Sequence, residues 1–351
     1  MGLQLRICLV FVSLFYLQTT ASAQEHAYQI GLLGFYNLEN LFDTIDTPDV
    51  NDTEFTPAGP KHYDTEMYLD KLGNLSQVIS EVGADLSPDG VAILGVAEIE
   101  NRSVLEDLVK QPALASRNYQ IVHYDSPDRR GIDVGLLYNP KYFTVAESRS
   151  VPVMIYDATD NSRIYTRDIL LVGGDYQGEQ LYVMVNHWPS RRGGEARSAP
   201  LRNAAALICK NLSDSLRLAA PNAKIVIMGD LNDDPVSPSV ADVLQAAGKI
   251  NKVRPGGFYS PMWSFFRQGI GTTAYRDAWS LFDQLVISDN WLDNEQAGYR
   301  FYQAYIYNPN HLVQKTGHFM GYPFRTFAGD TYLGGYSDHF PVYMAIIKPK
   351  F

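Results

Sequence analysis

The sequence is poor in cysteine, and this scarcity limits how the protein can be held together. Its 351 residues include two cysteines, Cys8 and Cys209. Cys8 falls inside an N-terminal leader, so the mature chain keeps only Cys209 and cannot form an intramolecular disulfide. Cysteine-rich zinc patterns and the HExxH zinc motif are also lacking. The fold must therefore depend on its hydrophobic core.

Positive charge is scarce as well, since the formal net charge is -10 at pH 7. An acidic protein is a poor non-specific binder of DNA or anionic lipid. Attraction for a phosphate substrate must then be local, from a metal ion or a small basic patch. The candidate patches are Arg129 with Arg130, and Arg191 with Arg192 and Arg197, in segments of loop composition. Solvated loops are the alternative interpretation.

The N-terminus has the pattern of a secretory signal peptide. Arg6 supplies a positive charge, the apolar run CLVFVSLFYL follows, and a small-residue ASA site precedes Gln24. The run is too short to span a bilayer, so a cleaved signal over residues 1–23 is favoured over a membrane anchor. We expect an exported protein, periplasmic or extracellular, with one domain over residues 24–351 and no stable membrane anchor.

Runs of apolar, β-branched and aromatic residues predict strands, and apolar stripes at helical spacing predict helices. The predicted strands cover 28–36, 91–97, 119–124, 133–138, 180–186, 224–229, 283–288 and 341–347, with two or three more inside 143–173. The predicted helices run from Tyr68 to Val82, over 102–109, and onward from Ser198 and Pro200. Segments 40–64 and 250–280 read as loops. This pattern favours two packed sheets with helices on their outer faces.

Polar residues stand at the ends of six of these strands. They are Asn37, Glu98, His187, Asp230 with Asn232, Asp283, and Asp338 with His339. Acids, amides and histidines repeated at strand ends predict one rim of a sheet where charge gathers. That layout is typical of a metal-dependent hydrolase.

GDLND, residues 229–233, is the most specific of these motifs. Gly229 lets the backbone turn at the strand end. Asp230 and Asn232, two residues apart in an extended segment, point to the same side. The carboxylate can deprotonate a water, and the amide can bind a phosphate oxygen. A tight turn, in which Asp and Asn are common, is the alternative.

SDHFPV, residues 337–342, places a candidate metal ligand beside a candidate cation. A protonated His339 can stabilise charge that develops on phosphorus, and a carboxylate on its other nitrogen keeps it protonated. Asp283 is the natural partner for that nitrogen. A capping Asp338 and a core histidine are the alternative. His187, in VNHWPSR, can protonate or hydrogen-bond an ester oxygen.

Glu98 is a lone carboxylate after a buried strand, so it must be protonated, paired or bound to a metal. Asn37 and Glu39, in FYNLEN, can share an ion with it. Oxygen ligands of this kind favour Mg²⁺, with Mn²⁺ or Ca²⁺ as alternatives, over Zn²⁺.

The joint presence of these motifs in this order resembles the endonuclease/exonuclease/phosphatase superfamily, the fold of deoxyribonuclease I and the abasic-site endonucleases. The resemblance covers residues 28–348 and implies an α/β (α+β) architecture, a four-layered αββα sandwich of two mixed sheets flanked by helices. His187 stands where the abasic-site enzymes carry an aromatic residue, so the chain is closer to the deoxyribonuclease I type. The segments FYNLENLFDT, SPDRRGIDVGLLY and NHWPSRRGGE look like a secreted bacterial subgroup often labelled nuclease.

The resemblance implies a Mg²⁺-dependent phosphodiesterase, and nucleic acid is the leading substrate. Asn37, Glu39, Glu98 and Asp338 would hold the metal, whereas Asp230, Asn232, His187, Asp283 and His339 would do the chemistry, and Arg130, Arg191 and Arg192 would bind phosphate. A phospholipid head group or an inositol phosphate is the alternative substrate. A binding protein that lost catalysis is the alternative class. DNA or RNA preference, endo- or exo-cleavage and oligomeric state stay open.

Overall fold

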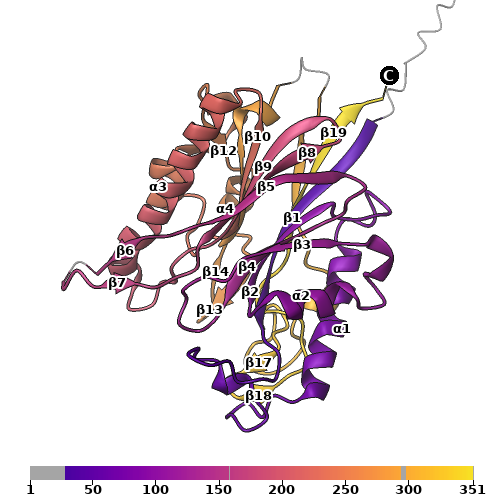
Figure 1. Cartoon of the computed structure of the whole chain (residues 1–351), viewed down its shortest axis with the longest axis vertical. Helices are drawn as coiled ribbons and strands as arrows, with labels where there is room; N and C mark the ends of the chain where they lie inside the picture. Colours follow the sequence, from indigo (N-terminus) through magenta and orange to yellow (C-terminus); the bar gives the residue numbers. More distant parts are fainter. Residues whose placement is uncertain (1–27, 158, 294–297, 351) are drawn as a thin grey trace, which may run out of the picture.

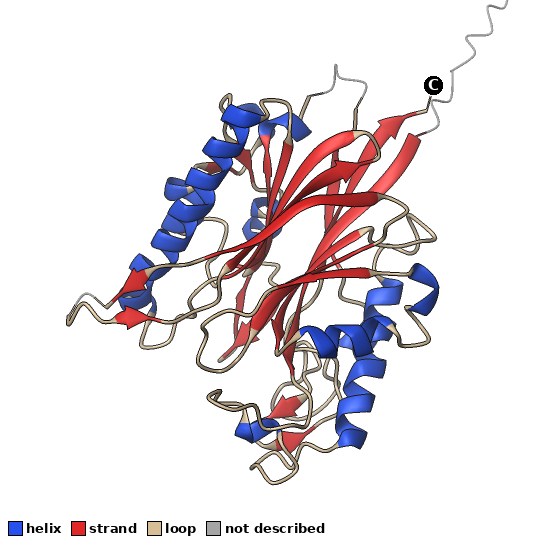
Figure 2. Ribbon diagram, in the orientation of Figure 1, coloured by secondary structure: helices blue, strands red, loops and turns tan. Residues whose placement is uncertain are grey.

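The computed structural model describes residues 28–157, 159–293 and 298–350. The predicted signal peptide, residues 1–23, lies outside the described residues. Figure 1 shows two packed sheets with helix α3 (Glu195–Ala219) along one side and helices α1 (Thr65–Glu81) and α2 (Arg102–Val109) along the other. The same layers are visible as red strands between blue helices in Figure 2. The predicted four-layered sandwich is therefore confirmed.

The first sheet has six strands in the order β16-β19-β1-β2-β4-β3. Their bounds are β1 Tyr28–Leu41, β2 Ile93–Ile99, β3 Gln120–His123, β4 Asp133–Tyr138, β16 Arg300–Ile306 and β19 Val342–Pro349. At its centre, β1 pairs parallel with β2 and antiparallel with β19.

The second sheet has seven strands in the order β11-β12-β15-β10-β9-β8-β5. Their bounds are β5 Phe143–Val151, β8 Ile169–Tyr176, β9 Glu179–His187, β10 Lys224–Asp230, β11 Ala246–Ala247, β12 Phe258–Tyr259 and β15 Asp283–Ser288. Here β10 pairs parallel with β9 and antiparallel with β15, which repeats the arrangement at the centre of the first sheet.

Smaller elements lie outside the sheets. They are the paired strands β6 Ile155–Tyr156 with β7 Arg163–Ile164, β13 Thr273–Tyr275 with β14 Ala278–Ser280, and β17 Phe327–Ala328 with β18 Thr331–Tyr332, and the short helix α4 Trp263–Arg267. Within the described part of the chain, no helix is both long and apolar enough to cross a membrane.

Three apolar layers separate the four structural layers. Strand β1 shows why, because its apolar residues alternate between two cores. Leu33 and Phe35 pack between the sheets, whereas Leu32 and Tyr36 pack toward α1. A third core joins the outer face of the second sheet to α3. Strands buried on both faces read as continuous apolar runs, which is the pattern seen in the sequence.

The strand directions bring the polar strand ends to one rim. Strands β1, β2, β9 and β10 run the same way within their parallel pairs, and their carboxyl ends carry Asn37, Glu98, His187 and Asp230. Strands β15 and β19 run antiparallel to them, so the residues at their amino ends reach the same rim. These are Asp283 and the pair Asp338 and His339.

The start of α3 and the nature of segment 250–280 differ from the prediction. Helix α3 begins at Glu195 rather than at Ser198, because Gly193 and Gly194 have φ of 81° and 106° and turn the chain directly into the helix. The Ser198 hydroxyl donates to the Gly194 carbonyl at 2.9 Å instead of capping. Segment 250–280 is not wholly a loop, since it contains α4 and the β13–β14 hairpin.

Helix α1 begins at a side-chain cap, and the cap gives a modest stability prediction. The Asp64 carboxylate accepts from the Met67 backbone N–H at 3.0 Å. Asp64→Ala should lower the free energy of unfolding by about 1 kcal/mol, the usual worth of an N-cap, as measured by urea denaturation. Asp64→Asn, which keeps an acceptor oxygen, should lose much less. Equal losses in the two variants would contradict the capping role.

Candidate active site

Asp230 lies at the centre of the group gathered at the rim. Its Oδ2 accepts from the Asn37 side-chain amide at 3.1 Å and lies 3.6 Å from Nε2 of His187. Nε2 of His339 lies 3.9 Å from the same oxygen. Oδ1 accepts from the Asn232 backbone N–H at 2.9 Å. One carboxylate therefore meets side chains from both sheets.

The backbone adopts unusual φ angles at several site residues. Glu98, Glu39 and Asn232 have φ of 59°, 50° and 48°, in the left-handed region that non-glycine residues seldom adopt. The register of β2 shifts at Glu98, and that of β1 shifts between Asn37 and Leu41. Bulges of this kind turn a side chain away from its place in the strand alternation. Such strain concentrates at functional sites.

His339 and Asp283 form a buried pair. Nδ1 of His339 lies 2.7 Å from Oδ2 of Asp283, which also accepts from the Thr272 hydroxyl at 2.5 Å. Burial alone would lower the pKa of His339. The charges of Asp283, Asp338 and Asp230 outweigh burial and raise this pKa well above 6.5. The imidazole at this position is therefore a cation at neutral pH.

His187 has the opposite electrostatic character. Burial, followed by the charges of Arg167, Arg130 and His339, lowers the pKa of His187 well below 6.5. Its ring is neutral at pH 7, and Nε2 lies 3.8 Å from Oε1 of Glu98. A neutral imidazole can donate a hydrogen bond at one nitrogen and accept at the other. Of its two predicted roles, the lowered pKa favours hydrogen bonding to an ester oxygen over its protonation.

The donor set fits a hard divalent cation. Glu98 and Asp338 offer carboxylate oxygens, Asn37 offers an amide oxygen, and the Asp230 carboxylate lies beside Asn37. Burial raises the pKa of Asp230 to about 6, and the charges of Asp283 and Glu98 add to this. A bound cation would reduce the electrostatic repulsion between these neighbouring carboxylates. No cysteine belongs to the group, which argues against a thiolate metal site.

Glu39 has contacts different from those predicted. Its Oε2 accepts from the Thr326 backbone N–H at 2.7 Å, and Oε1 accepts from that of Phe327 at 3.4 Å. Burial and the charge of Asp338 raise the pKa of Glu39 to about 7. The structure thus places Glu39 where it fixes the segment before Asp338, and its part in a metal site stays a prediction.

The arginines divide into different roles. Arg191 donates to the Asn232 carbonyl at 2.9 Å and pairs with Asp233 and Asp234, each at 3.2 Å. These acids of the GDLND segment already occupy donors of Arg191, and its role in clamping a substrate phosphate stays a prediction. Arg192 is exposed beside it, and Arg130 is 46% exposed with its charge in range of His187.

Some residues that support the site were not predicted. Lys71 of α1 is almost fully buried, and its ammonium donates to the Thr326 hydroxyl at 2.6 Å. Arg202 of α3 is also buried, and its Nε lies 2.8 Å from Oδ1 of Asp233. Both stand at polar positions of amphipathic helices, where the sequence pattern predicts exposure. Only the buried acids nearby, which the sequence does not place in space, explain them.

A second group of potential ligands lies at the ends of β3 and β4. The ligand atoms of His123, Asp125 and Asp133 lie within 4.8 Å of one another. Nε2 of His123 is 3.0 Å from Oδ2 of Asp133, and the Ser126 backbone N–H donates to Oδ1 at 2.8 Å. These hydrogen bonds already satisfy the buried carboxylate, so we assign no metal to this group.

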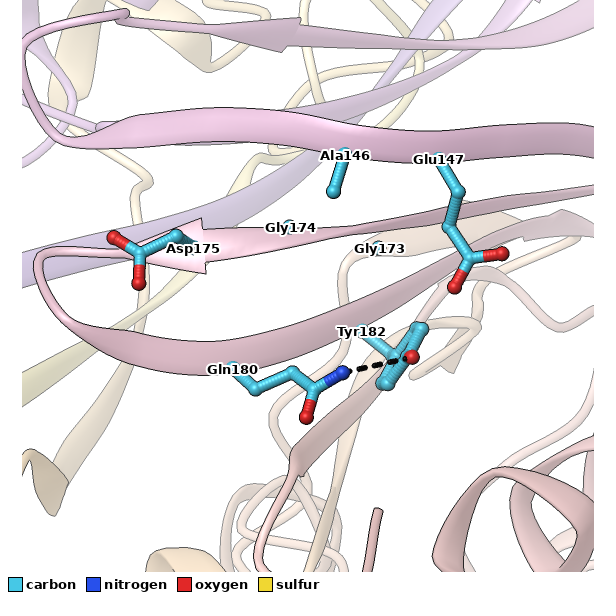
Figure 3. A pocket seen from close by; sticks show the side chains of 7 residues that line it. All are labelled: Ala146, Glu147, Gly173, Gly174, Asp175, Gln180 and Tyr182. Carbon is cyan, nitrogen blue, oxygen red and sulfur yellow. Dashed lines mark hydrogen bonds between the residues drawn. The ribbon is translucent and has the colours of Figure 1, made fainter. Parts of the chain in front are cut away.

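A cavity of about 230 Å³ lies on β5, β8 and β9 and takes no part in this arrangement (Figure 3). It is lined by Ala146, Glu147, Gly173, Gly174, Asp175, Gln180 and Tyr182. Tyr182 precedes His187 by five residues, or roughly 16 Å along a strand. The cavity exists where Gly173 has no side chain, since a Cβ there would stand 2.4 Å from the Tyr182 ring.

Comparison with known proteins bears on the family and the fold of the chain. Residues 32–348 match the model of the Endonuclease/Exonuclease/phosphatase family. No curated protein matches the chain.

Solved structures share the fold at low identity. An endonuclease/exonuclease/phosphatase family protein from Bacteroides thetaiotaomicron is 14% identical, with a TM-score of 0.55 over 92% of this chain and 97% of that one. D. rerio TDP2 complexed with single strand DNA product is 14% identical, with a TM-score of 0.53 over 90% and 98%. A mannosyl-6-phosphatase from B. thetaiotaomicron is 15% identical, with a TM-score of 0.52 over 90% and 99%. At such identities the likeness concerns the fold alone.

Proposed function

The chain belongs to the endonuclease/exonuclease/phosphatase family, and on that premise we propose that it is a Mg²⁺-dependent phosphodiesterase acting on nucleic acid. The coarser assignment, a divalent-metal-dependent phosphoester hydrolase, follows from the family. One observation carries the proposal. A single buried carboxylate oxygen, Oδ2 of Asp230, lies within 4 Å of a neutral His187 and a cationic His339, at 3.6 and 3.9 Å.

The two histidines and the aspartate suit in-line attack of water on a phosphoester. Asp230, with a pKa raised to about 6 by burial, takes the proton of the water while Asn232 holds the carboxylate through its backbone N–H. The His339 cation stabilises charge on the phosphoryl oxygens, and Asp283 keeps it charged. His187 donates a hydrogen bond to another oxygen.

The metal would be held by Glu98, Asn37 and Asp338. When bound, it supplies a Lewis acid that polarises a phosphoryl oxygen. Asp338 is 30% exposed, and Oδ2 lies 3.5 Å from Nη2 of Arg325. Its side chain thus remains reachable from solvent, as an entering ion requires.

A small phosphoester is the second candidate substrate. The net charge of -10 disfavours a long polyanion, and one protein of the same fold is a mannosyl-6-phosphatase. Nucleic acid stays the first candidate because another protein of the same fold, D. rerio TDP2, was solved in complex with a single-strand DNA product. We keep export through a signal peptide at residues 1–23 as part of the proposal, with oligomeric state open.

The test is hydrolysis of plasmid DNA, RNA, sphingomyelin, inositol phosphates and a sugar phosphate, with Mg²⁺ or with chelator. We expect DNA or RNA cleavage that chelator abolishes, Mg²⁺ restores, and Asp230→Ala lowers in kcat by about 10²-fold or more. Asp175→Ala, an exposed aspartate on β8, is the matched control and should keep full activity.

Each other result has a definite meaning. Turnover of only a small phosphoester would keep the mechanism and replace the substrate. Full activity in chelator would contradict the metal dependence. An effect of Asp230→Ala on KM alone would contradict its role in the transition state.

A further inference from the structure

Arg167, two residues before β8, carries a buried guanidinium with three partners. It is 6% exposed. Its Nε donates to the His187 carbonyl at 3.1 Å, and Nη2 donates to the Trp188 carbonyl at 2.7 Å. Its Nη1 donates to Oδ2 of Asp128 at 3.1 Å. Because the guanidinium is planar, these bonds fix their acceptors in one mutual geometry.

The two carbonyl bonds hold the end of β9 against the GDLND segment. The Trp188 carbonyl also accepts from the Asn232 side-chain amide at 2.9 Å. The Trp188 backbone N–H donates to the Asp230 carbonyl at 3.0 Å. Arg167 therefore stands directly behind the strand end that places His187 beside Asp230.

The third bond reaches a different part of the chain, the loop over residues 125–131, here called the arginine loop. Oδ1 of Asp128 accepts from the Arg130 backbone N–H at 2.9 Å and lies 3.8 Å from Nε of Arg130. The Arg129 carbonyl accepts from the Asn51 N–H at 3.0 Å. Asp128 is thus the link between the buried guanidinium and an arginine that is 46% exposed.

We propose that Arg167 is a positioning residue that couples the arginine loop to the end of β9, so that Arg130 meets substrate phosphate beside His187. The inference rests on the proposed phosphoester hydrolysis. It explains how a protein with a net charge of -10 can present a cation at a site rich in carboxylates. Asp128 holds Arg130 at this place, and the buried Arg167 guanidinium neutralises the charge of Asp128.

Arg217 shows what an arginine with a purely structural role looks like in this molecule. On the last turn of α3, its guanidinium donates to the carbonyls of Gly256 and Gly257 and lies 3.8 Å from Asp289. Like Arg167 it pairs with two backbone carbonyls and with carboxylate, here Asp289 and also Asp214 at 3.7 Å, but it contacts none of the rim residues. Arg217→Met is therefore a matched control for Arg167→Met.

The experiment measures kcat and KM for a single-stranded DNA oligonucleotide with saturating Mg²⁺. Arg167→Met should lower kcat/KM by about 10²-fold, because a small displacement of catalytic groups has that effect. Asp128→Ala and Arg130→Ala should each raise KM by about tenfold with kcat nearly kept, since uniform binding is lost. The double variant should raise KM little beyond either single variant, because both substitutions remove the same interaction between Asp128 and Arg130.

Hydrogen exchange of the arginine loop gives a readout that needs no substrate. Exchange over 125–131 should rise in Arg167→Met and Asp128→Ala and stay unchanged in Arg217→Met. Equal exchange and equal kinetics in the two arginine variants would overturn the inference, as would additive KM effects of Asp128→Ala and Arg130→Ala. If the wild type hydrolyses no phosphoester, the proposed function fails, and unchanged loop exchange in Arg167→Met would still refute the coupling.

Discussion

The substitution His339→Gln is expected to lower kcat by about 10²–10³-fold while KM changes by less than about threefold. The pKa of His339 lies well above 6.5 because Asp283, Asp338 and Asp230 outweigh burial, so the ring is cationic at pH 7.5. Glutamine keeps a hydrogen-bond donor but no charge. The loss therefore reports how much the cation stabilises the transition state. Steady-state kinetics with Mg²⁺ at pH 7.5 measure it.

His311→Gln is the control for loss of a histidine elsewhere. Nε2 of His311 lies 3.1 Å from Glu81 at the end of α1, and its side chain is 37% exposed. Activity should be unchanged in this variant. A rise in KM alone for His339→Gln, or equal losses in the two variants, would contradict the assigned role.

Asp283→Asn tests the same cation through its pH dependence. Asp283 raises the pKa of His339 against the effect of burial, so this pKa should fall when the carboxylate charge is removed. The active form is the protonated one, so activity is lost as pH rises through this pKa. The alkaline limb of the kcat profile should therefore move to lower pH in Asp283→Asn. An alkaline limb at the wild-type position would show that His339 does not need Asp283.

The rim could be predicted because strand ends are visible in the sequence. Asn37, Glu98, His187 and Asp230 each follow an apolar run, and parallel pairing brings such ends to one edge. Antiparallel pairing brings Asp283 to the same edge, directly opposite Asp230 in the register of β15 and β10. Period-two and apolar-run patterns carry this information because each strand is buried on both faces.

The β-bulges that set the side-chain directions of Glu98 and Glu39 could not be predicted from the sequence. Glu98 and Glu39 have positive φ, a conformation set by tertiary contacts rather than by local propensity. The carboxylate of Glu39 is turned toward the backbone of Thr326 and Phe327, 287 or more residues away in sequence. A sequence pattern in FYNLEN places Glu39 near Asn37, but it cannot show which of the two faces the reacting group.

The arginines show the same limit. RRGG and RRGI look alike as glycine-flanked basic pairs, yet Arg191 is committed to Asp233 and Asp234 whereas Arg130 is half-exposed. The difference depends on which acids fold beneath each loop. Arg202, in the middle of a helix, has its partner 31 positions further along the chain, and only the packed structure reveals that it is buried.

Asp233→Ala is expected to lower the free energy of unfolding by about 3–5 kcal/mol, the usual result when one partner of a buried ion pair is removed. Arg202 is fully buried, and its Nε lies 2.8 Å from Oδ1 of Asp233. Without the carboxylate, Ser198 is its nearest side-chain partner, with the hydroxyl 2.9 Å from Nη1. A buried cation is then left without its counter-charge. Urea denaturation measures the loss.

Arg202→Met should cost less than Asp233→Ala, because Asp233 keeps Arg191 at 3.2 Å and the Ser239 hydroxyl at 2.6 Å. The double variant should recover at least about 2 kcal/mol of the Asp233→Ala loss, since methionine removes the unpaired charge. If the double variant is as unstable as Asp233→Ala, lost packing and not an unpaired charge explains the effect. If it recovers stability but not activity, Asp233 and Arg202 hold the geometry of the GDLND segment rather than the fold.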